Sequence, residues 1–405
     1  MNKLLRFNWL MFGAMTVLIV LGVMSIWSAG NAREAIFHDM WKNHLGSALT
    51  GLAIYFALAF TDYRYTVRIA SPFAYGLSLI FLVAVLFLGS TVYGGRRWLW
   101  FFQPSEVAKL CTIMFLASVV TWDSDDTVGR PAISDAADGE GKPSDGRHAR
   151  KGFGLFAASC VVAGIPALLI LVEPDLGTTL ALFPAVIAML VAGGVWRKGL
   201  FTALAISAVA ASLVLGAVWE AEKPGQSDEK RTQILRHVPL KPHQVQRVKT
   251  FLFPESDPTG SGYTLRQSLI AIGSGGVIGK GIGKGEANRL KYLPPSISMN
   301  DFIFCVYAEE TGYIGSLAML SLFALLCTSG AWIAWRSRDP CGRVLAIGVT
   351  TLIFAHAYIN IGMGVGLLPI TGLPLPFISS GRTFLLVVMA GLGLVQSVAI
   401  HGNEE

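Results

Sequence analysis

Ten long apolar runs are the feature of this sequence that most constrains its fold. A helix needs about 20 mostly apolar residues to cross a bilayer, whereas a clearly shorter apolar stretch is typical of a buried core helix. The runs therefore predict an all-α polytopic membrane protein with about ten transmembrane helices. They lie at 9–29, 44–60, 71–90, 105–121, 153–172, 176–194, 200–219, 301–327, 344–363 and 382–400.

Composition excludes several other classes of protein. The 405 residues are 53% hydrophobic and only 14% charged, whereas soluble domains are about a quarter charged. This shortfall excludes a soluble enzyme and a disordered chain. The five cysteines are far apart and form no C-x-x-C pair, so they indicate neither a disulfide framework nor a zinc site. No segment combines a basic stripe with a polar fold, which argues against nucleic-acid binding.

The distribution of Lys and Arg predicts the orientation in the membrane. If the amino end is cytoplasmic, the inner loops carry fourteen of these residues and the short outer loops carry five. The positive-inside rule then favours ten spans with both termini in the cytoplasm, in the cytoplasmic membrane. The first run is too long for the core of a signal peptide, so it is expected to remain as the first helix.

Two long connections complete the predicted single domain of residues 1–405. Residues 123–150 are rich in Asp, Gly, Ser and Pro and are expected to form a flexible cytoplasmic loop. Residues 220–300 form a large extracytoplasmic loop between spans 7 and 8, and a loop of this length with internal structure is usually functional. Its glycine-rich stretch 263–282 is too weakly apolar to span, so it is expected at the interface or re-entering the membrane.

Ionisable residues inside the apolar runs are the first candidates for a site. Such groups are costly in a membrane, so they normally pair and face a cavity. Glu106 and Lys109 are three residues apart and share a helical face; they form either an ion pair for packing or the floor of a polar cavity. Glu173 and Asp175 flank Pro174 between two spans. They form a solvated turn in which Asp175 caps the next helix, or a pair of carboxylates that binds a cation or a sugar.

Further candidates lie in the second half of the chain. Asp301 opens the eighth run, either as a helix cap or as a functional carboxylate at the outer boundary. Glu309 and Glu310 follow within the same run and are expected to line a cavity. The glycine run 273–285 fits neither the Walker pattern nor the dinucleotide fingerprint. It is either a flexible interfacial segment or one that holds Lys280 and Lys284 near an anionic headgroup or a pyrophosphate.

Two more segments are unusual for a membrane helix. Residues 368–381 form an apolar stretch broken by proline and glycine, and such backbone needs protein or a wet cavity around it. The aromatic residues Trp98, Trp100, Phe101 and Phe102 favour an interfacial belt over a sugar-binding platform. The seven histidines are scattered and receive no predicted role.

At these residues the sequence resembles the SEDS family of bacterial cell-wall proteins (shape, elongation, division and sporulation), and its RodA members more than its FtsW members. The matching segments follow the family order along nearly the whole chain. They are Arg97-Trp98 with Gln103-Pro-Ser-Glu-Val-Ala-Lys109, Glu173-Pro-Asp-Leu-Gly-Thr178, residues 267–276, Asp301-Phe-Ile-Phe with Ala308-Glu-Glu310, and residues 368–379. Family members commonly have His-Thr at Met299-Asn300, and Ser-Tyr-Gly-Gly-Ser at Ser379-Ser-Gly-Arg-Thr383, a departure that puts Arg382 near the outer cavity.

The resemblance implies a peptidoglycan glycosyltransferase for cell-wall synthesis and cell shape or division. It would polymerise lipid II on the outer face of the cytoplasmic membrane, beside a class B penicillin-binding protein. The essential aspartate of the family falls on Asp301, and its polar cavity residues fall on Glu106, Lys109 and Asp175. A lipid-linked precursor flippase and a non-catalytic scaffold for the penicillin-binding protein are the alternatives.

The implied chemistry is an inverting glycosyl transfer from an undecaprenyl-pyrophosphate-linked donor. Asp301 is the predicted general base, because it lies at the boundary that lipid-anchored sugars can reach. The departing pyrophosphate needs positive charge. Arg96, Arg97, Lys280, Lys284 or a divalent cation held by carboxylates would supply that charge, and the sequence does not choose between them.

Overall fold

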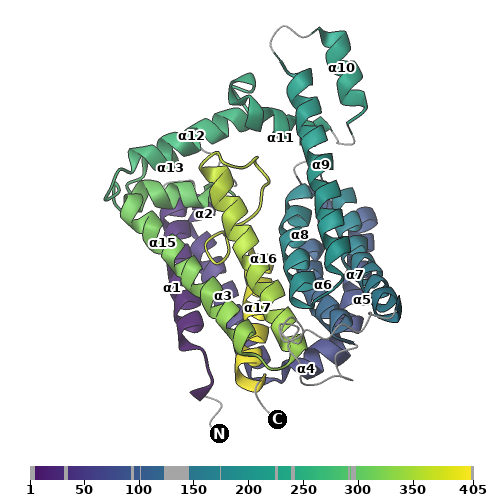
Figure 1. The fold of residues 1–405 in the computed structure, drawn as a ribbon. Helices are drawn as coiled ribbons and strands as arrows, with labels where there is room; N and C mark the ends of the chain where they lie inside the picture. The colour runs from purple at the N-terminus through teal and green to yellow at the C-terminus, as the bar shows by residue number, and fades with distance from the viewer. Residues whose placement is uncertain are drawn as a thin grey trace.

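The computed structural model is almost entirely helical (Figure 1). It describes residues 5–31, 35–92, 95–100, 102–122, 146–173, 175–223, 227–238, 242–290, 292 and 298–402. In these ranges the only sheet is a two-stranded antiparallel hairpin of β1 (Ser90–Val92) and β2 (Gly95–Trp98). The predicted all-α architecture is therefore confirmed.

Ten long helices coincide with the ten predicted runs. Eight of the spans are long and apolar enough to cross a membrane, with the short α4 (Tyr63–Tyr65) and η2 (Thr66–Ala70) counted together with α5. The helices α6 and α8 have 17 residues each and are shorter than the others. The ten are α1 (Trp9–Asn31), α3 (Met40–Phe60), α5 (Ser71–Leu88), α6 (Pro104–Val120), α7 (Gly146–Val172), α8 (Leu176–Ala192), α9 (Arg197–Ala221), α15 (Ile303–Arg336), α16 (Pro340–Gly364) and α17 (Arg382–His401).

The two predicted long connections differ in structure. Of the predicted flexible loop 123–150, residues 123–145 lie outside the described residues, and α7 begins at Gly146 rather than after the loop. The 220–300 connection is largely helical. It contains α10 (Asp228–Arg236), α11 (Pro242–Leu252), η5 (Pro254–Ser256), α12 (Ser261–Ser274) and α13 (Glu286–Arg289), while the short α2 (Ala35–His38) precedes α3.

Local sequence explains where several helices begin. Pro104 opens α6, where its missing N–H costs no hydrogen bond. The Asp175 carboxylate accepts a hydrogen bond from the backbone N–H of Thr178 at 3.2 Å and caps α8. Asp339 caps α16 in the same way, by accepting hydrogen bonds from the N–H groups of Cys341 and Gly342.

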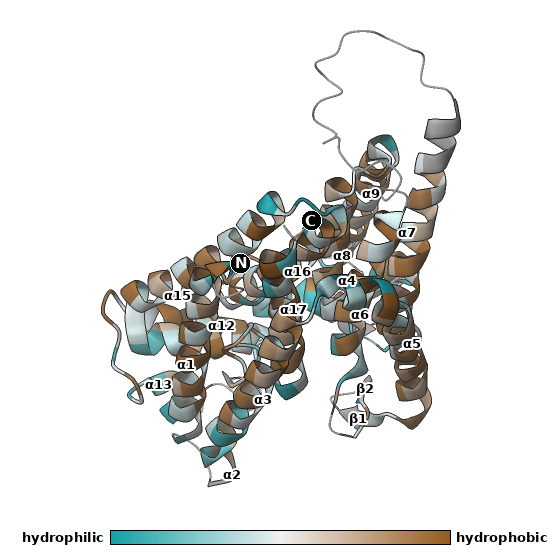
Figure 2. Cartoon of the chain, turned by 90° about the horizontal axis from the view of Figure 1, so that it is seen from below, coloured by the Kyte–Doolittle hydropathy of each residue, from teal (hydrophilic) through white to brown (hydrophobic). Residues whose placement is uncertain are grey.

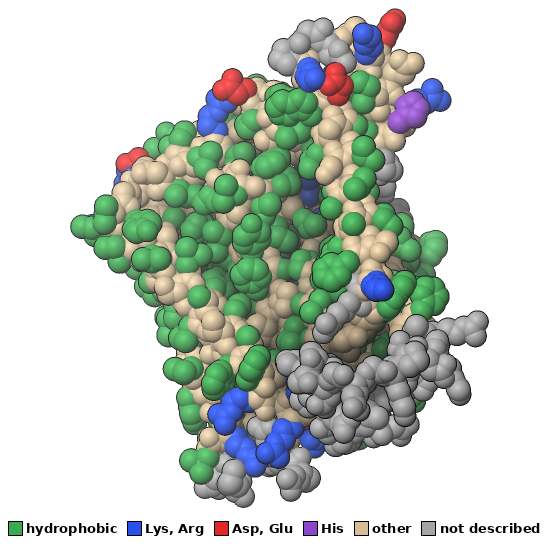
Figure 3. Space-filling view, viewed as in Figure 1, with side chains coloured by type: hydrophobic (Ala, Val, Ile, Leu, Met, Phe, Trp, Pro, Cys, Tyr) green, Lys and Arg blue, Asp and Glu red, His purple; other side chains and the backbone are tan. Residues whose placement is uncertain are grey.

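The centre of the bundle is formed by the last two helices. The most apolar parts of α16 and α17 are 72% and 78% buried, compared with 6% for α9. Helix α9 exposes large apolar side chains such as Phe201 and Leu213, which are 70% and 69% exposed. Most residues of the long helices are hydrophobic (Figure 2), and hydrophobic side chains cover much of the molecular face shown in Figure 3. Because a soluble protein does not expose so much apolar surface, the exterior faces lipid.

Both described termini lie at one end of the bundle (Figure 1). The guanidinium of Arg6 donates a hydrogen bond to the carbonyl of Ile400 at 3.2 Å. Lys and Arg side chains gather at this end (Figure 3). We call it the terminal end. The helices α11, α12 and α13 and the irregular segment 365–381 lie at the opposite end, which we call the loop end (Figure 1).

Candidate active site

Asp301 lies at the loop end, two residues before α15 begins. It is half-buried against the 365–381 segment, since a Cβ atom added at Gly372 would lie 3.5 Å from its Oδ2. Its backbone carbonyl accepts a hydrogen bond from the side-chain amide of Asn360 at 2.9 Å. The backbone of Asp301 is therefore hydrogen-bonded to α16, and its carboxylate lies beside the segment between α16 and α17.

Charged side chains from three other elements surround this carboxylate. Arg247 of α11 donates a hydrogen bond to the carbonyl of Thr371 at 2.9 Å, next to Gly372. Burial raises the pKa of Asp301 to about 6; Arg247 and Arg97 lower this pKa, and Asp175 raises it. Burial and the neighbouring Arg97 lower the pKa of Arg247, against the opposing effects of Asp175 and Asp301. These four residues form one electrostatic cluster.

Asp175 connects the cluster to the starts of α6 and α8. The side-chain amide of Gln103 donates a hydrogen bond to Asp175 Oδ2 at 3.2 Å, while Oδ1 caps α8. Glu173 is 1% exposed, and in the described residues neither of its carboxyl oxygens has a hydrogen-bond partner. Burial, together with the nearby Asp175, raises the pKa of Glu173 to about 8, against the lowering effect of Arg97. Glu173 is thus mostly protonated at neutral pH, and Asp175 is both a helix cap and part of the cluster.

A buried network of three ionisable residues lies beside the cluster, inside the bundle. Lys109 Nζ is 2.8 Å from Glu106 Oε2, and the two side chains are 1% and 3% exposed. The ion pair that the three-residue spacing indicated is therefore present. Lys109 Nζ also lies 2.8 Å from His356 Nε2 and 5.3 Å from the centre of the Phe384 ring. Asp175 acts electrostatically on Glu106, so this network and the Asp301 cluster are neighbours.

The structure separates Lys280 from Asp301 and its charged neighbours. Lys280 Nζ is 2.8 Å from Glu309 Oε1 and 3.3 Å from Glu286 Oε2. Glu309, which was expected to line a cavity, instead accepts hydrogen bonds from Lys280 and from the backbone N–H groups of Glu286 and Ala287. It holds the glycine run against α15, because its buried carboxylate satisfies these donors. Lys284 is exposed.

The glycines of this run allow its close approach to α15. Gly279, Gly281 and Gly283 have φ of 88°, 97° and 78°, a region that other residues rarely adopt. A Cβ atom at Gly312 would lie 2.4 Å from the backbone nitrogen of Gly279. The run therefore has a structural role in the loop-end assembly.

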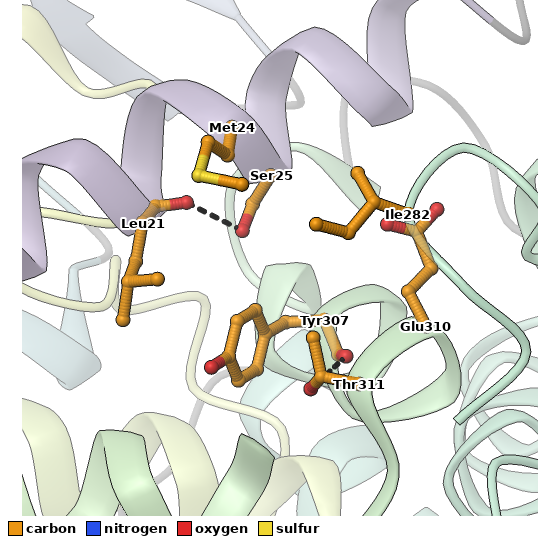
Figure 4. A pocket seen from close by; sticks show the side chains of 7 residues that line it. All are labelled: Leu21, Met24, Ser25, Ile282, Tyr307, Glu310 and Thr311. Carbon is orange, nitrogen blue, oxygen red and sulfur yellow. Dashed lines mark hydrogen bonds between the residues drawn. The ribbon is translucent and has the colours of Figure 1, made fainter. Parts of the chain in front are cut away.

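Glu310 does line a cavity, but a small one whose lining residues do not include Asp301 (Figure 4). The cavity has a volume of about 50 Å³ and lies between α1, the glycine run and α15. The Glu310 carboxylate accepts a hydrogen bond from Ser28 of α1, while Tyr307 and Thr311 also line the cavity. Glu310 thus connects α15 to α1 and contributes nothing to the Asp301 cluster.

Sequence reasoning missed three residues of the site. Arg247 lies in the long loop, and no local pattern placed it near Asp301. Asn360 is a neutral residue in an apolar helix, where no charge marks it as part of a site. His356 could have been found, because the argument applied to Glu106 and Lys109 holds for any ionisable residue in a span. Of the other predicted residues, Arg97 joins the cluster, and the side chain of Arg96 lies outside the described part of the chain.

Comparison with known proteins assigns the chain to a family. A family model described as "FTSW_RODA_SPOVE: Cell cycle protein" matches residues 2–404. The chain belongs to this family. The resemblance to the SEDS proteins RodA and FtsW is thereby confirmed, and with it the fold class of a polytopic helical membrane protein.

Curated members of the FtsW/RodA/SpoVE family match over nearly the whole chain. Peptidoglycan glycosyltransferase MrdB, a RodA protein of Escherichia coli K12, is 34% identical over 389 residues, which are 95% of this chain and 91% of that protein. The probable peptidoglycan glycosyltransferase FtsW of Trichlorobacter lovleyi is 30% identical over 407 residues, 98% and 94% of the two chains. The predicted enzyme class is therefore confirmed as a glycosyltransferase, and the MrdB match supports the preference for RodA.

Solved structures of family members have the same fold. A chain of a peptidoglycan synthase complex that coordinates polymerization and crosslinking matches with a TM-score of 0.69, 26% identity, and coverage of 98% of this chain and 99% of that one. The rod shape determining protein RodA of Thermus thermophilus matches with a TM-score of 0.63 and 22% identity, covering 98% of both chains. The arrangement of helices described above is thus that of the family.

Proposed function

We propose that this FtsW/RodA/SpoVE-family protein polymerises lipid II into glycan strands on the outer face of the cytoplasmic membrane. The observation that carries the proposal is the Asp301 carboxylate beside Arg247, Arg97 and Asp175 at the loop end. A base next to two guanidinium groups suits a displacement that removes a proton and releases an anion. The names of the curated relatives, peptidoglycan glycosyltransferases, support this substrate.

In the proposed reaction an acceptor sugar hydroxyl attacks the anomeric carbon of the donor. Asp301 accepts the hydroxyl proton as the new C–O bond forms. The bond from the anomeric carbon to the pyrophosphate oxygen breaks on the opposite face, so an α-linked donor gives a β-linked product. Undecaprenyl pyrophosphate leaves with the electron pair. This single displacement requires one base and a stabilised leaving group.

Arg97 and Arg247 would stabilise the pyrophosphate as its negative charge grows. Fixed positive groups in a partly dry site act strongly because little solvent screens them. Lys280 has no part in this proposal, since Glu309 and Glu286 already engage it. Among the described residues, no three His, Cys, Asp or Glu side chains are grouped so as to hold a metal ion, and no step is assigned to a cation. The Glu106–Lys109–His356 network would form the floor below the sugar.

The partner and the orientation belong to the same proposal. A class B penicillin-binding protein would crosslink the product, in line with the similarity to a chain of a peptidoglycan synthase complex. The terminal end would face the cytoplasm, because its exposed basic residues follow the positive-inside rule. Arg6 and Arg64 are half-buried at this end, and Arg68, Arg336 and Arg338 are exposed.

The proposed orientation predicts where reporters will be found. A reporter fused after Glu405 should be cytoplasmic, and one inserted near Asp257 should be external, because the three last spans separate these two sites. Alkaline phosphatase and green fluorescent protein fusions, which are active on opposite sides of the membrane, measure this directly. A phosphatase-active fusion at Glu405 would rule out the ten-span topology.

The proposed base also predicts the pH dependence. Asp301 must be ionised to accept a proton, so the polymerisation rate should fall as the pH drops through about 6, its raised pKa. Arg247→Gln removes a charge that lowers this pKa, so the acid limb should move to higher pH. Asp175→Asn removes a charge that raises it, so the limb should move to lower pH. The kcat of the purified complex, measured from about pH 4.5 to 8, tests both signs; a limb that neither variant moves would exclude Asp301 as the titrating base.

Polymerisation by purified protein tests the function itself. The protein and its penicillin-binding protein are reconstituted in detergent with lipid II, and glycan length is followed by electrophoresis while a transpeptidase inhibitor blocks crosslinking. Glycans that lengthen only when this chain is present support the proposal. The partner is chosen to have no polymerase activity of its own. A flippase, which only moves lipid II between leaflets, would then yield no glycan in detergent, and neither would a scaffold that only activates its partner.

A further inference from the structure

Three consecutive backbone carbonyls just before α15, those of residues 299–301, accept hydrogen bonds from α16 and from the 365–381 segment. The carbonyl of Met299 accepts a hydrogen bond from the N–H of Ser380 at 3.1 Å. The carbonyl of Asn300 accepts one from the Ser379 hydroxyl at 2.6 Å, and that of Asp301 accepts one from the Asn360 amide at 2.9 Å. We call Asn360, Ser379 and Ser380 the carbonyl clamp.

Asn360 is the most deeply buried member of the clamp. Its side chain is 0% exposed in α16, and Nδ2 donates to the carbonyls of both Asp301 and Leu373, at 2.9 and 2.6 Å. Two carbonyl acceptors fix the amide nitrogen on that side, because an oxygen there would face two other oxygens. The amide thereby joins the Asp301 backbone to the 365–381 segment.

The two serines hold the neighbouring residues in a similar way. Ser379 Oγ accepts a hydrogen bond from the N–H of Leu375 at 2.8 Å while it donates to the carbonyl of Asn300. The Ser380 hydroxyl donates to Asn300 Oδ1 at 2.5 Å. Asn300 and Ser380 are two positions at which the sequence departs from the family pattern, and the structure places them in contact.

We propose that the carbonyl clamp is the positioning device of Asp301, and that Asn360 is its main residue. This inference rests on the proposed catalytic role of Asp301. The clamp contacts the backbone of residues 299–301 and the side chain of Asn300, and none of these hydrogen bonds uses the Asp301 carboxylate. It fixes that carboxylate relative to the 365–381 segment, to which Arg247 is also bound through Thr371. The proposed base Asp301 and Arg247 are thus both held against the same 365–381 segment.

The clamp should act on the rate of the chemical step more than on substrate binding. A misplacement of about 1 Å at a reacting group can cost about 10²-fold in rate. The clamp residues contact no substrate in the proposed reaction, so the KM for lipid II should change little. If the 365–381 segment were loosened, the Asp301 carboxylate would also become more exposed to solvent. Its charged neighbours Arg247, Asp175 and Arg97 would remain, so relief of burial would move the acid limb of kcat to lower pH.

The test uses the full chain in complex with its penicillin-binding protein. Asn360→Leu removes both donated hydrogen bonds with little change in volume, and Asn360→Asp keeps the shape but places oxygen against two carbonyls. Gln396→Leu is the matched control: Gln396 is another fully buried amide in a spanning helix, and its Oε1 accepts a hydrogen bond from the Tyr55 hydroxyl, away from the site. Thermal melting and size-exclusion chromatography report folding for each variant.

We expect both Asn360 variants to lower kcat by about 10- to 100-fold with KM nearly unchanged, and the uncharged Asn360→Leu to shift the acid limb to lower pH. Gln396→Leu should melt at a similarly lowered temperature but keep the kcat and pH profile of the parent. A normal kcat and pH profile in folded Asn360 variants would overturn the proposal, and so would losses no larger than those of Gln396→Leu at equal stability.

A smaller change tests the clamp where the Asn360 variants do not fold. Ser379→Ala removes only a hydroxyl, and it should lower kcat and shift the pH profile in the same direction. An unchanged profile in this variant would overturn the clamp. The failure of the proposed function is distinguishable, because it would show as normal polymerisation by Asp301→Asn, whereas failure of the clamp alone leaves Asp301→Asn inactive.

Discussion

Asp301→Asn should reduce lipid II polymerisation by about 10²–10⁴-fold, the usual cost of a missing general base. The asparagine side chain has nearly the same shape, but its amide cannot accept the proton of the attacking hydroxyl. Folding should survive, because the hydrogen bonds of the 299–301 segment are made by backbone carbonyls. Burial of the Asp301 carboxylate is unfavourable in itself, so its removal should not destabilise the protein.

The matched control for this variant is Asp257→Asn. Asp257 also precedes a helix at the loop end, where its carboxylate accepts hydrogen bonds from the N–H groups of Gly260 and Ser261 at 2.9 Å. Asparagine caps helices about as well as aspartate, so this variant should polymerise normally. Rates are measured with purified complexes of equal partner content. Near-normal glycan synthesis by Asp301→Asn would remove the residue from catalysis, and loss of folding would assign it a structural role.

Lys109→Ala should destabilise the protein by about 3–5 kcal/mol, the cost of breaking a buried ion pair by removing one partner. Lys109 and Glu106 are nearly inaccessible to solvent, and Lys109 is also hydrogen-bonded to His356. Its removal leaves a carboxylate and an imidazole inside the bundle without that partner. Polymerisation should fall as well, because the network borders the Asp301 cluster. Thermal unfolding in detergent and the polymerisation rate measure the two effects.

Two further variants separate the charge from the packing. The double variant Glu106→Gln with Lys109→Met removes both charges and keeps the side-chain volumes, so it should recover most of the lost stability, whereas activity should stay low. Lys42→Ala is the surface control. Lys42 and Asp39 have the same three-residue spacing and an N···O distance of 2.7 Å, but their side chains are 61% and 70% exposed. Because solvent screens such a pair, no measurable loss is expected. Unchanged stability in Lys109→Ala would mean that the pair is not buried.

The helices and much of the site could be predicted because their signals are local. A run of about 20 apolar residues has one stable form in a bilayer, since only a helix satisfies all of its backbone hydrogen bonds internally. The starts of α6 and α8 are likewise set by Pro104 and Asp175, which act within one turn. The pairing of Glu106 with Lys109 follows from helix geometry, because residues three apart lie on one face.

Tertiary contacts decided which charges meet Asp301. The sequence offered Lys280 as one of several groups, with Arg96, Arg97, Lys284 and a divalent cation, that would stabilise the pyrophosphate, and it did not choose between them. In the structure, Glu309 and Glu286 engage Lys280, and Arg247 of α11 takes the place beside Asp301. Arg247 and Asp301 are 54 positions apart in the chain, and no periodicity acts over that distance.

The sequence by itself determined the membrane class, the helices, the family and the catalytic candidate, because each is encoded within a turn of helix, a span or a short motif. Only the tertiary structure decided the surroundings of that candidate. His356 and Asn360 are one helical turn apart in α16 and meet Lys109 and the Asp301 carbonyl. Their partners come from α6 and the approach to α15, and these contacts form only when distant segments pack to satisfy buried polar groups.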